Sequence, residues 1–253
     1  MTVMIQKKII LITGVLIGLC GCAGSLHLPP PQSGASYVVT YQPSHQMDTG
    51  ENFNEAEVCN AIAGEAIAAA SPSLKVHKVW SYDQMGLHHA RVGSNTKIDH
   101  TSVLDSTGAI SGYAFEIRES NRIGPDIFIA LHNNGASGQN ACWGFVHEGD
   151  AFEPTNRKLA ALLVEAVSKV SGLKNAGVHG DSEPNRNDYR CAVTGKLSFY
   201  SLDENVNHAP VRVLLEIGDN ALSREILLNK EMQKKIGVAV QKALEAVLLP
   251  HEY

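Results

Sequence analysis

Two histidines and one glutamate stand at the ends of apolar segments whose composition predicts β-strands. His132 closes a long apolar run and is followed by a polar, glycine-containing turn. His45 follows the β-branched and aromatic segment 37–41, and Glu216 lies in the apolar segment 211–217. In open α/β sheets, ligand-binding and catalytic residues collect beyond the carboxyl ends of the strands. A histidine at that position is a candidate metal ligand or general base.

A second carboxylate completes a chemically coherent set. Glu55 stands at the first position of a predicted helix, directly after Asn54, which is a good N-cap residue. Two imidazoles and one carboxylate form a recognised catalytic zinc set, with the fourth position left to water. Glu216 would then be the separate carboxylate that takes the proton of the water, because burial at an apolar strand end raises a carboxyl pKa toward working pH.

Each of these residues also has a plain structural interpretation. A histidine can simply begin a loop, and a glutamate at a helix N-terminus is favoured by the helix dipole. A carboxylate inside an apolar strand is costly, however, unless it is paired, protonated or close to a metal. Three such strand ends in one chain, at His45, His132 and Glu216, favour a shared site.

The elements between these residues alternate between strand and helix patterns. Apolar stripes at helical spacing predict helices over 55–70, 156–171 and 223–248. This alternation predicts an α/β fold with a mostly parallel central sheet flanked by helices, a hydrolase-like sandwich. Further strands are expected over 75–80, 109–117, 141–146 and 197–202, and the segments 81–106 and 175–195 are expected to be loops.

The N-terminal region has the pattern of a secreted lipoprotein. Residues 1–21 combine two lysines with a short apolar stretch and small residues, which predicts a signal peptide. The run Leu19-Cys20-Gly21-Cys22 resembles a lipobox, which implies lipid attachment at Cys22. Residues 22–36 are rich in Pro, Ser and Gly and are expected to be a flexible tether, followed by one domain over 37–253.

The overall charge argues against nucleic acid as a partner. The whole chain has a formal net charge of −5, and removal of a signal segment with two lysines and no acids makes it −7. Three cysteines follow Cys22, without the spacing of a zinc finger. A disulfide between Cys142 and Cys191 is compatible with an oxidising compartment, and Cys59 is expected to be a buried thiol in a helix.

The strand-end motifs together resemble the zinc-dependent N-acetylmuramoyl-L-alanine amidases of the Amidase_3 type. That family has a histidine after its first strand, a glutamate opening its first helix, a second histidine in an S-I-H-A-N motif and a late L-V-E-x-G strand. The corresponding runs here are Pro43-Ser44-His45, Asn54-Glu55-Ala56, Ala130-Leu131-His132-Asn133-Asn134 and Leu214-Leu215-Glu216-Ile217-Gly218. The first turn lacks the double glycine of the family, and Asp219 replaces its usual Phe.

The resemblance implies hydrolysis of the amide between N-acetylmuramic acid and L-alanine in peptidoglycan. It implies Zn²⁺ held by His45, Glu55 and His132, with Glu216 as the catalytic residue. Asn134, Arg91 and Arg118 are the candidate substrate-binding residues. With a lipid on Cys22, the protein is expected on the periplasmic side of an envelope membrane, and the outer membrane is favoured. An activator protein is a candidate partner.

Two other functions are compatible with the same residues. One is a different zinc peptidase or deacylase on this fold, for which Arg91 or Arg190 could bind a terminal carboxylate. The other is a catalytically inactive lipoprotein that binds the cell wall. Metal content separates the inactive protein from both enzymes, and the reaction product separates the two enzymes from each other.

Overall fold

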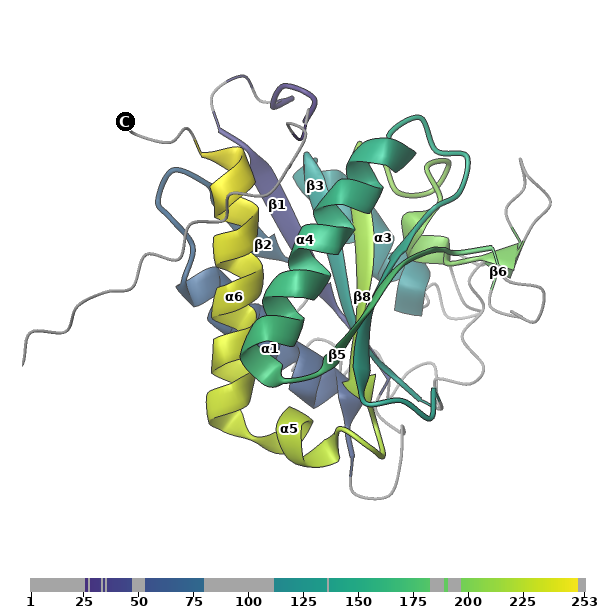
Figure 1. Cartoon of the computed structure of the whole chain (residues 1–253). Helices are drawn as coiled ribbons and strands as arrows, with labels where there is room; N and C mark the ends of the chain where they lie inside the picture. Colours follow the sequence, from purple (N-terminus) through teal and green to yellow (C-terminus); the bar gives the residue numbers. More distant parts are fainter. Residues whose placement is uncertain are drawn as a thin grey trace, which may run out of the picture.

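The computed structural model describes residues 26, 28–32, 34, 36–46, 53–79, 112–135, 137–182, 189–190 and 197–249. A six-stranded sheet forms the centre of the molecule, in the order β2-β1-β3-β8-β4-β5 (Figure 1). The strands of this sheet are β1 (Val38–Pro43), β2 (Lys75–Lys78), β3 (Ile127–Asn134), β4 (Ala141–Val146), β5 (Lys174–Gly180) and β8 (Val211–Asp219).

The sheet is parallel except at one pair of strands. β1 pairs in parallel with β2 and β3, β3 with β8, and β4 with β5, whereas β4 and β8 are antiparallel. The carboxyl ends of β1, β3 and β8 therefore meet at one edge of the sheet, which we call the carboxyl edge. The opposite edge, where these three strands begin, is called the amino edge.

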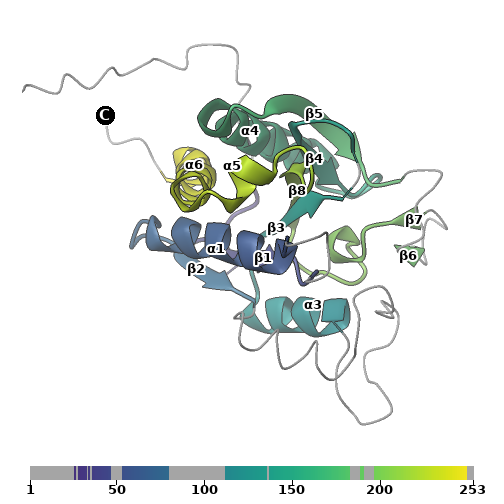
Figure 2. The ribbon, with the colours of Figure 1, turned by 90° about the horizontal axis from the view of Figure 1, so that it is seen from below.

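Helices cover both faces of the sheet (Figure 2). The larger apolar core joins one face to α1 (Glu55–Ala68), α4 (Glu153–Ser171) and α6 (Lys230–Leu248), with α5 (Arg224–Leu228) beside them. A smaller core on the other face includes residues of α3 (Gly112–Ile123) and of the short 3₁₀ helix η2 (Tyr200–Leu202). A two-stranded ribbon, β6 (Tyr189–Arg190) with β7 (Leu197–Ser198), is antiparallel. The predicted α/β class is confirmed.

The described part of the segment expected to be a strand over 109–117, residues 112–117, is helical. In α3, Glu116, Ile117 and Ser120 are buried while Arg118 is exposed. That spacing of three to four residues places the buried side chains on one side of a helix, whereas a strand would alternate at every second residue. The helix docks on the sheet partly through Ser120, whose hydroxyl lies 3.2 Å from the hydroxyl of Thr40 on β1.

The loop expected over 175–195 contains an edge strand. Among the described strands, β5 pairs only with β4. Its side chains are mostly exposed or half-buried, so its sequence lacks an apolar run. The pairing register shifts between Cys142 and Gly144 of β4, where β5 carries one additional residue. Gly177 has a φ of 82° at this irregularity, a backbone conformation that glycine adopts readily. The short glycine-rich strand therefore resembled a loop.

Two other segments differ from the sequence prediction. The C-terminal helix is interrupted at Asn229, whose extended backbone separates α5 from α6. Its side chain accepts a hydrogen bond from the amide of Met232 and caps the second helix. The strand expected over 197–202 is divided between β7 and η2.

Part of the predicted tether lies on the domain. Leu26 and Leu28 pack against the larger core, and Tyr37 donates a hydrogen bond to the carbonyl of Pro29. The backbone amide of Gln32 donates to Oδ1 of Asp126 at 2.7 Å, directly before β3. These contacts hold the segment at the amino edge of the sheet. In the part of the chain that the structure describes, no helix is both long enough and apolar enough to span a membrane.

Close packing of α1 against α6 generates a prediction about two glycines. A Cβ on Gly237 of α6 would lie 2.5 Å from the carbonyl oxygen of Ile62, whereas a Cβ on Gly64 of α1 would meet nothing within 4 Å. We expect Gly237→Ala to lower the free energy of unfolding by about 1–3 kcal/mol, because backbone cannot rotate away from the added methyl group.

The matched substitution, Gly64→Ala, should raise that free energy by about 0.5–1 kcal/mol, because alanine favours the helix. Urea denaturation followed by circular dichroism measures both. A Gly237→Ala protein as stable as the wild type would contradict the close approach of the two helices.

Candidate active site

Strand pairing brings His45, His132 and Glu216 together at the carboxyl edge. His132 of β3 lies directly opposite Glu216 of β8 in the parallel register. The amide of Ser44 donates to the carbonyl of Leu131 at 2.8 Å, so His45 follows β1 beside His132. Both histidines are buried, and Glu216 is partly exposed. The sheet thus places two imidazoles and one accessible carboxylate next to one another.

Glu55 reaches this edge from the first turn of α1. Its Oε1 lies 3.2 Å from Nδ1 of His132 and accepts a hydrogen bond from the backbone amide of Asn133 at 3.1 Å. As predicted, Asn54 caps the helix, because its side chain accepts from the amide of Glu57. The cap fixes where α1 begins, and therefore where the Glu55 carboxylate enters the site.

A third carboxylate, Glu116, approaches from α3 on the other face of the sheet. Its Oε1 lies 3.1 Å from Nδ1 of His45, and its Oε2 accepts a short hydrogen bond from Nε2 of Gln42. The Glu116 side chain is fully buried. Sequence reasoning missed this residue because its segment was expected to be a strand. The helical spacing of Glu116 and Ser120 was the signal that could have identified it.

The buried carboxylates make the site electrostatically negative. Burial by itself lowers the pKa of His132, but the hydrogen bond and charge of Glu55, with the charges of Glu216 and Glu116, raise it above its ordinary value. Burial raises the pKa of the Cys59 thiol well above normal, and the charges of Glu55 and Glu216 add to that increase. Such a field favours a bound cation.

The donor types fit a zinc ion, although three donors do not converge. Within the described ranges, no group of three His, Cys, Asp or Glu side chains is arranged to hold a metal. Nδ1 of His132 and Oε1 of Glu55 are 3.2 Å apart, close to the separation of about 3.3 Å expected for two tetrahedral ligands at 2.0–2.1 Å from one zinc. In this arrangement Nδ1 of His132 would be the ligand atom, and Nε2, which is buried without a hydrogen-bond partner among the described residues, would not bind the ion.

Two residues shortly after Glu216, Gly218 and Asp219, have structural roles. Gly218 has a φ of 72°, and a Cβ there would lie 2.7 Å from Cβ of Ser223, so the turn requires glycine. The Asp219 carboxylate accepts hydrogen bonds from the Ser137 hydroxyl and from the amides of Gly138, Ala221 and Leu222. Asp219 therefore joins the turn after β8 to the loop that follows His132.

The other predicted residues are less closely connected to this site. Asn134 ends β3 opposite Asp219, and its carbonyl accepts from the amide of Asn220. Arg118 is exposed and lies on the opposite side of α3 from Glu116. Their substrate-binding roles stay predictions.

Cys142 is a free, buried thiol. Arg91, Arg190's side chain, Cys191 and the lipidation site Cys22 lie outside the described residues.

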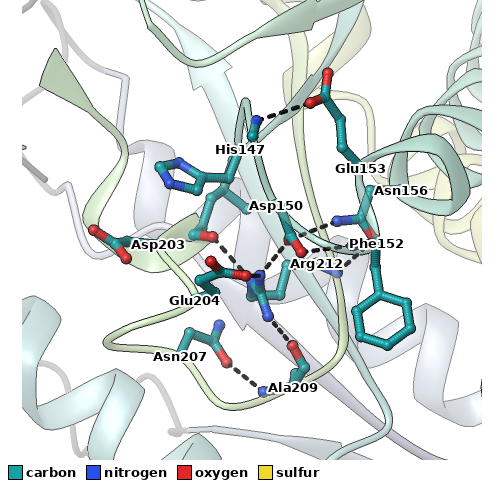
Figure 3. Close-up of polar contacts among 12 residues, drawn as sticks. His147, Asp150, Phe152, Glu153, Asn156, Asp203, Glu204, Asn207, Ala209 and Arg212 are labelled. Carbon is teal, nitrogen blue, oxygen red and sulfur yellow. Dashed lines mark hydrogen bonds and ion pairs between the residues drawn. The ribbon is translucent and has the colours of Figure 1, made fainter. Parts of the chain in front are cut away.

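A second buried polar cluster lies near the amino edge, around Arg212 of β8 (Figure 3). The guanidinium of Arg212 forms short hydrogen bonds with Asp150 and with the carbonyl of Ala209, and it also donates to the carbonyl of Leu202. These contacts join the turn after β4 to η2 and to the segment that leads into β8. The Asp150 carboxylate and the two carbonyl groups thus lie against the positive charge of Arg212, and this cluster is a structural ion pair.

A histidine–aspartate pair lies beside this cluster. Nδ1 of His147 is 2.8 Å from Oδ2 of Asp181, which also accepts from the amide of Phe199 at 3.2 Å. Burial alone lowers the pKa of His147, but the hydrogen bond and charge of Asp181, together with the charge of Asp203, raise it. Asp181 thus fastens the end of β5 to the segment before η2. Because β4 and β8 are antiparallel, this pair lies at the end of the sheet away from Glu216.

Comparison with known proteins identifies the same group of enzymes as the strand-end motifs. The sequence profile described as N-acetylmuramoyl-L-alanine amidase, Amidase_3, matches residues 95–246. A search of curated protein sequences gives no match.

Several solved structures share the fold. The catalytic domain of CwlV, an N-acetylmuramoyl-L-alanine amidase from Bacillus (Paenibacillus) polymyxa var. colistinus, is 17% identical, with a TM-score of 0.55 over 84% of this chain and 98% of that one. The amidase AmiC2 of Nostoc punctiforme is 14% identical, with a TM-score of 0.57 over 85% and 98%. The Clostridioides difficile amidase CwlD, solved with the GerS lipoprotein, is 15% identical, with a TM-score of 0.55 over 84% and 98%. At these identities the likeness establishes the fold.

Proposed function

Because the chain belongs to the N-acetylmuramoyl-L-alanine amidase family, we propose that it is a zinc-dependent peptidoglycan amidase. Its substrate bond would be the amide between the lactyl group of N-acetylmuramic acid and L-alanine. The observation that carries this proposal is the grouping of His45, Glu55 and His132 at the edge where Glu216 is partly exposed. The set has the ligand types of a catalytic zinc site, and Glu216 is a further carboxylate that would not bind the metal.

Each residue would have a distinct role in this reaction. His45, Glu55 and His132 would hold the zinc ion, which when bound polarises the amide carbonyl and makes a neighbouring water more acidic. Glu216 accepts the proton of the water that attacks the carbonyl carbon. It then returns that proton to the amide nitrogen as the carbon–nitrogen bond breaks, which leaves a lactyl carboxylic acid and a free L-alanine amine.

The neighbourhood of Glu216 supports such a role. It lies opposite His132 on one side and opposite Trp143 of β4 on the other. The apolar Trp143 is nearly buried, while the glutamate itself is partly exposed. A carboxylate in this position lies among buried neighbours and, being partly exposed, can still exchange protons with water.

We expect Glu216→Gln to lose at least 100-fold in amidase activity, because a general base typically contributes 10²–10⁴-fold. The assay is release of free stem peptides from purified peptidoglycan, analysed by mass spectrometry, with zinc content measured in parallel. Glu57→Gln, on an exposed residue of the same charge, is the matched control and should retain activity.

Three results would count against the proposal in different ways. An active Glu216→Gln protein would overturn the role of Glu216. Zinc without released stem peptides would favour a different amide hydrolase, and a protein that binds no zinc would favour a wall-binding lipoprotein. Since the CwlD structure contains a lipoprotein partner, the same assay with added envelope extract tests the expected activator.

We also propose that the protein is anchored in the outer membrane through a lipid on Cys22. Leu26 is only four positions after Cys22, a reach of at most about 14 Å. Leu26 and Leu28 pack on the domain, and Gln32 bonds to Asp126 at the amino edge. β3 has eight residues, so the two edges lie about 26 Å apart. The anchor would therefore hold the amino edge near the membrane and direct the catalytic edge away from it, toward the wall.

This orientation can be tested with fluorescent labels on the lipidated protein in vesicles, in a Cys191→Ser background. Ser73→Cys places a label on the exposed turn before β2 at the amino edge, and Leu222→Cys places one on the exposed turn after β8. Lipids with nitroxide headgroups should quench the label at position 73 much more strongly than the label at 222. Equal or reversed quenching would contradict the orientation, and an unmodified Cys22 in mass spectrometry would contradict the anchor.

A further inference from the structure

Glu116 is a buried carboxylate at the catalytic edge that no motif identified. Its contacts within the described part of the chain are the neutral amide of Gln42 and the imidazole of His45. Neither partner carries a permanent positive charge. A buried carboxylate without a cation costs several kcal/mol of solvation free energy, so its presence at a fully buried position requires a reason.

Docking of α3 does not supply that reason. One turn further along, Ser120 already bonds to Thr40 of β1, and Ile117 packs in the smaller core. An apolar side chain at position 116 would fill the same space without the cost of a buried charge. The carboxylate must therefore serve the polar groups that it touches.

Its two oxygens face different groups. Oε2 accepts from the side-chain amide of Gln42, which fixes the carboxylate against β1. Oε1 is left to face Nδ1 of His45 at 3.1 Å. A carboxylate at that position favours the proton on Nδ1, so the lone pair of the ring is on Nε2. Histidines that bind metals commonly have such a carboxylate on the other ring nitrogen, which sets the tautomer and the orientation of the ring.

We propose that Glu116 is a positioning residue that holds His45 in the Nδ1–H tautomer, with Nε2 directed to the metal. The inference rests on the proposed zinc-dependent function. It assigns to α3 a direct part in the site: Glu55 approaches His132 from α1 on one face of the sheet, and Glu116 approaches His45 from α3 on the other. His45 would be oriented by a helix outside the four strand-end and helix-opening motifs.

The test compares two variants of Glu116 with a control on the same helix. Glu116→Gln keeps an acceptor oxygen but removes the charge, and Glu116→Met removes both at similar size. Glu119→Gln is the control, because Glu119 is partly exposed and pairs with Arg122. Zinc affinity is measured by competition with a chelator. Thermal stability is measured as the melting temperature of the metal-free proteins. The tautomer of His45 is identified by nitrogen NMR of the imidazole ring at pH 9.

We expect zinc affinity to fall about 10–100-fold in Glu116→Met and less in Glu116→Gln, with no change in Glu119→Gln. The metal-free variants should melt at or above the wild-type temperature, and the Nδ1–H signal of His45 should weaken. Unchanged zinc affinity in Glu116→Met, or loss of metal-free stability with an unchanged tautomer, would overturn the positioning role. A wild-type protein that binds no zinc would overturn the proposed function itself, and the positioning role with it.

Discussion

The parallel register of β1, β3 and β8 is the constraint on which the rest of the structure depends. It places Pro43 beside Leu131 and His132 beside Glu216. Because side chains alternate along a strand, a slip of one residue would turn either functional side chain to the other face of the sheet. The buried apolar residues that precede each strand end fix the register, since a slip would also move Ile129 or Val213 from the larger core to the smaller one. Packing of the apolar core thus determines where the side chains of His132 and Glu216 lie.

The helices bring acidic groups to the same edge from opposite sides. Glu55 arrives from α1 on the face of the larger core, and Glu116 arrives from α3 on the face of the smaller core. With Glu216 between them, the carboxylates surround two imidazoles in a setting that raises the pKa of His132. Such a concentration of negative charge is costly without a cation. The other buried polar cluster differs, because Arg212 supplies its positive charge from within the chain.

The sequence predicted the parts of this site that follow strong local patterns. Apolar runs closed by a polar residue located the strands that end near His132 and Glu216, and the capping residue Asn54 located the start of α1. Glu116 could not be found in this way, because the sequence of its segment also fits a strand. β5 was missed for a related reason, since an edge strand with glycines and exposed side chains has no apolar run.

The measurement that tests the central claim most directly is X-ray absorption at the zinc edge, on zinc-loaded wild-type protein and on a His45→Ala, His132→Ala double variant. The account predicts one zinc per wild-type chain, bound by nitrogen and oxygen at about 2.0–2.2 Å with two imidazoles, and loss of that ion in the double variant. Sulfur ligands at about 2.3 Å, or an ion that the double variant retains unchanged, would contradict a zinc site at the carboxyl edge.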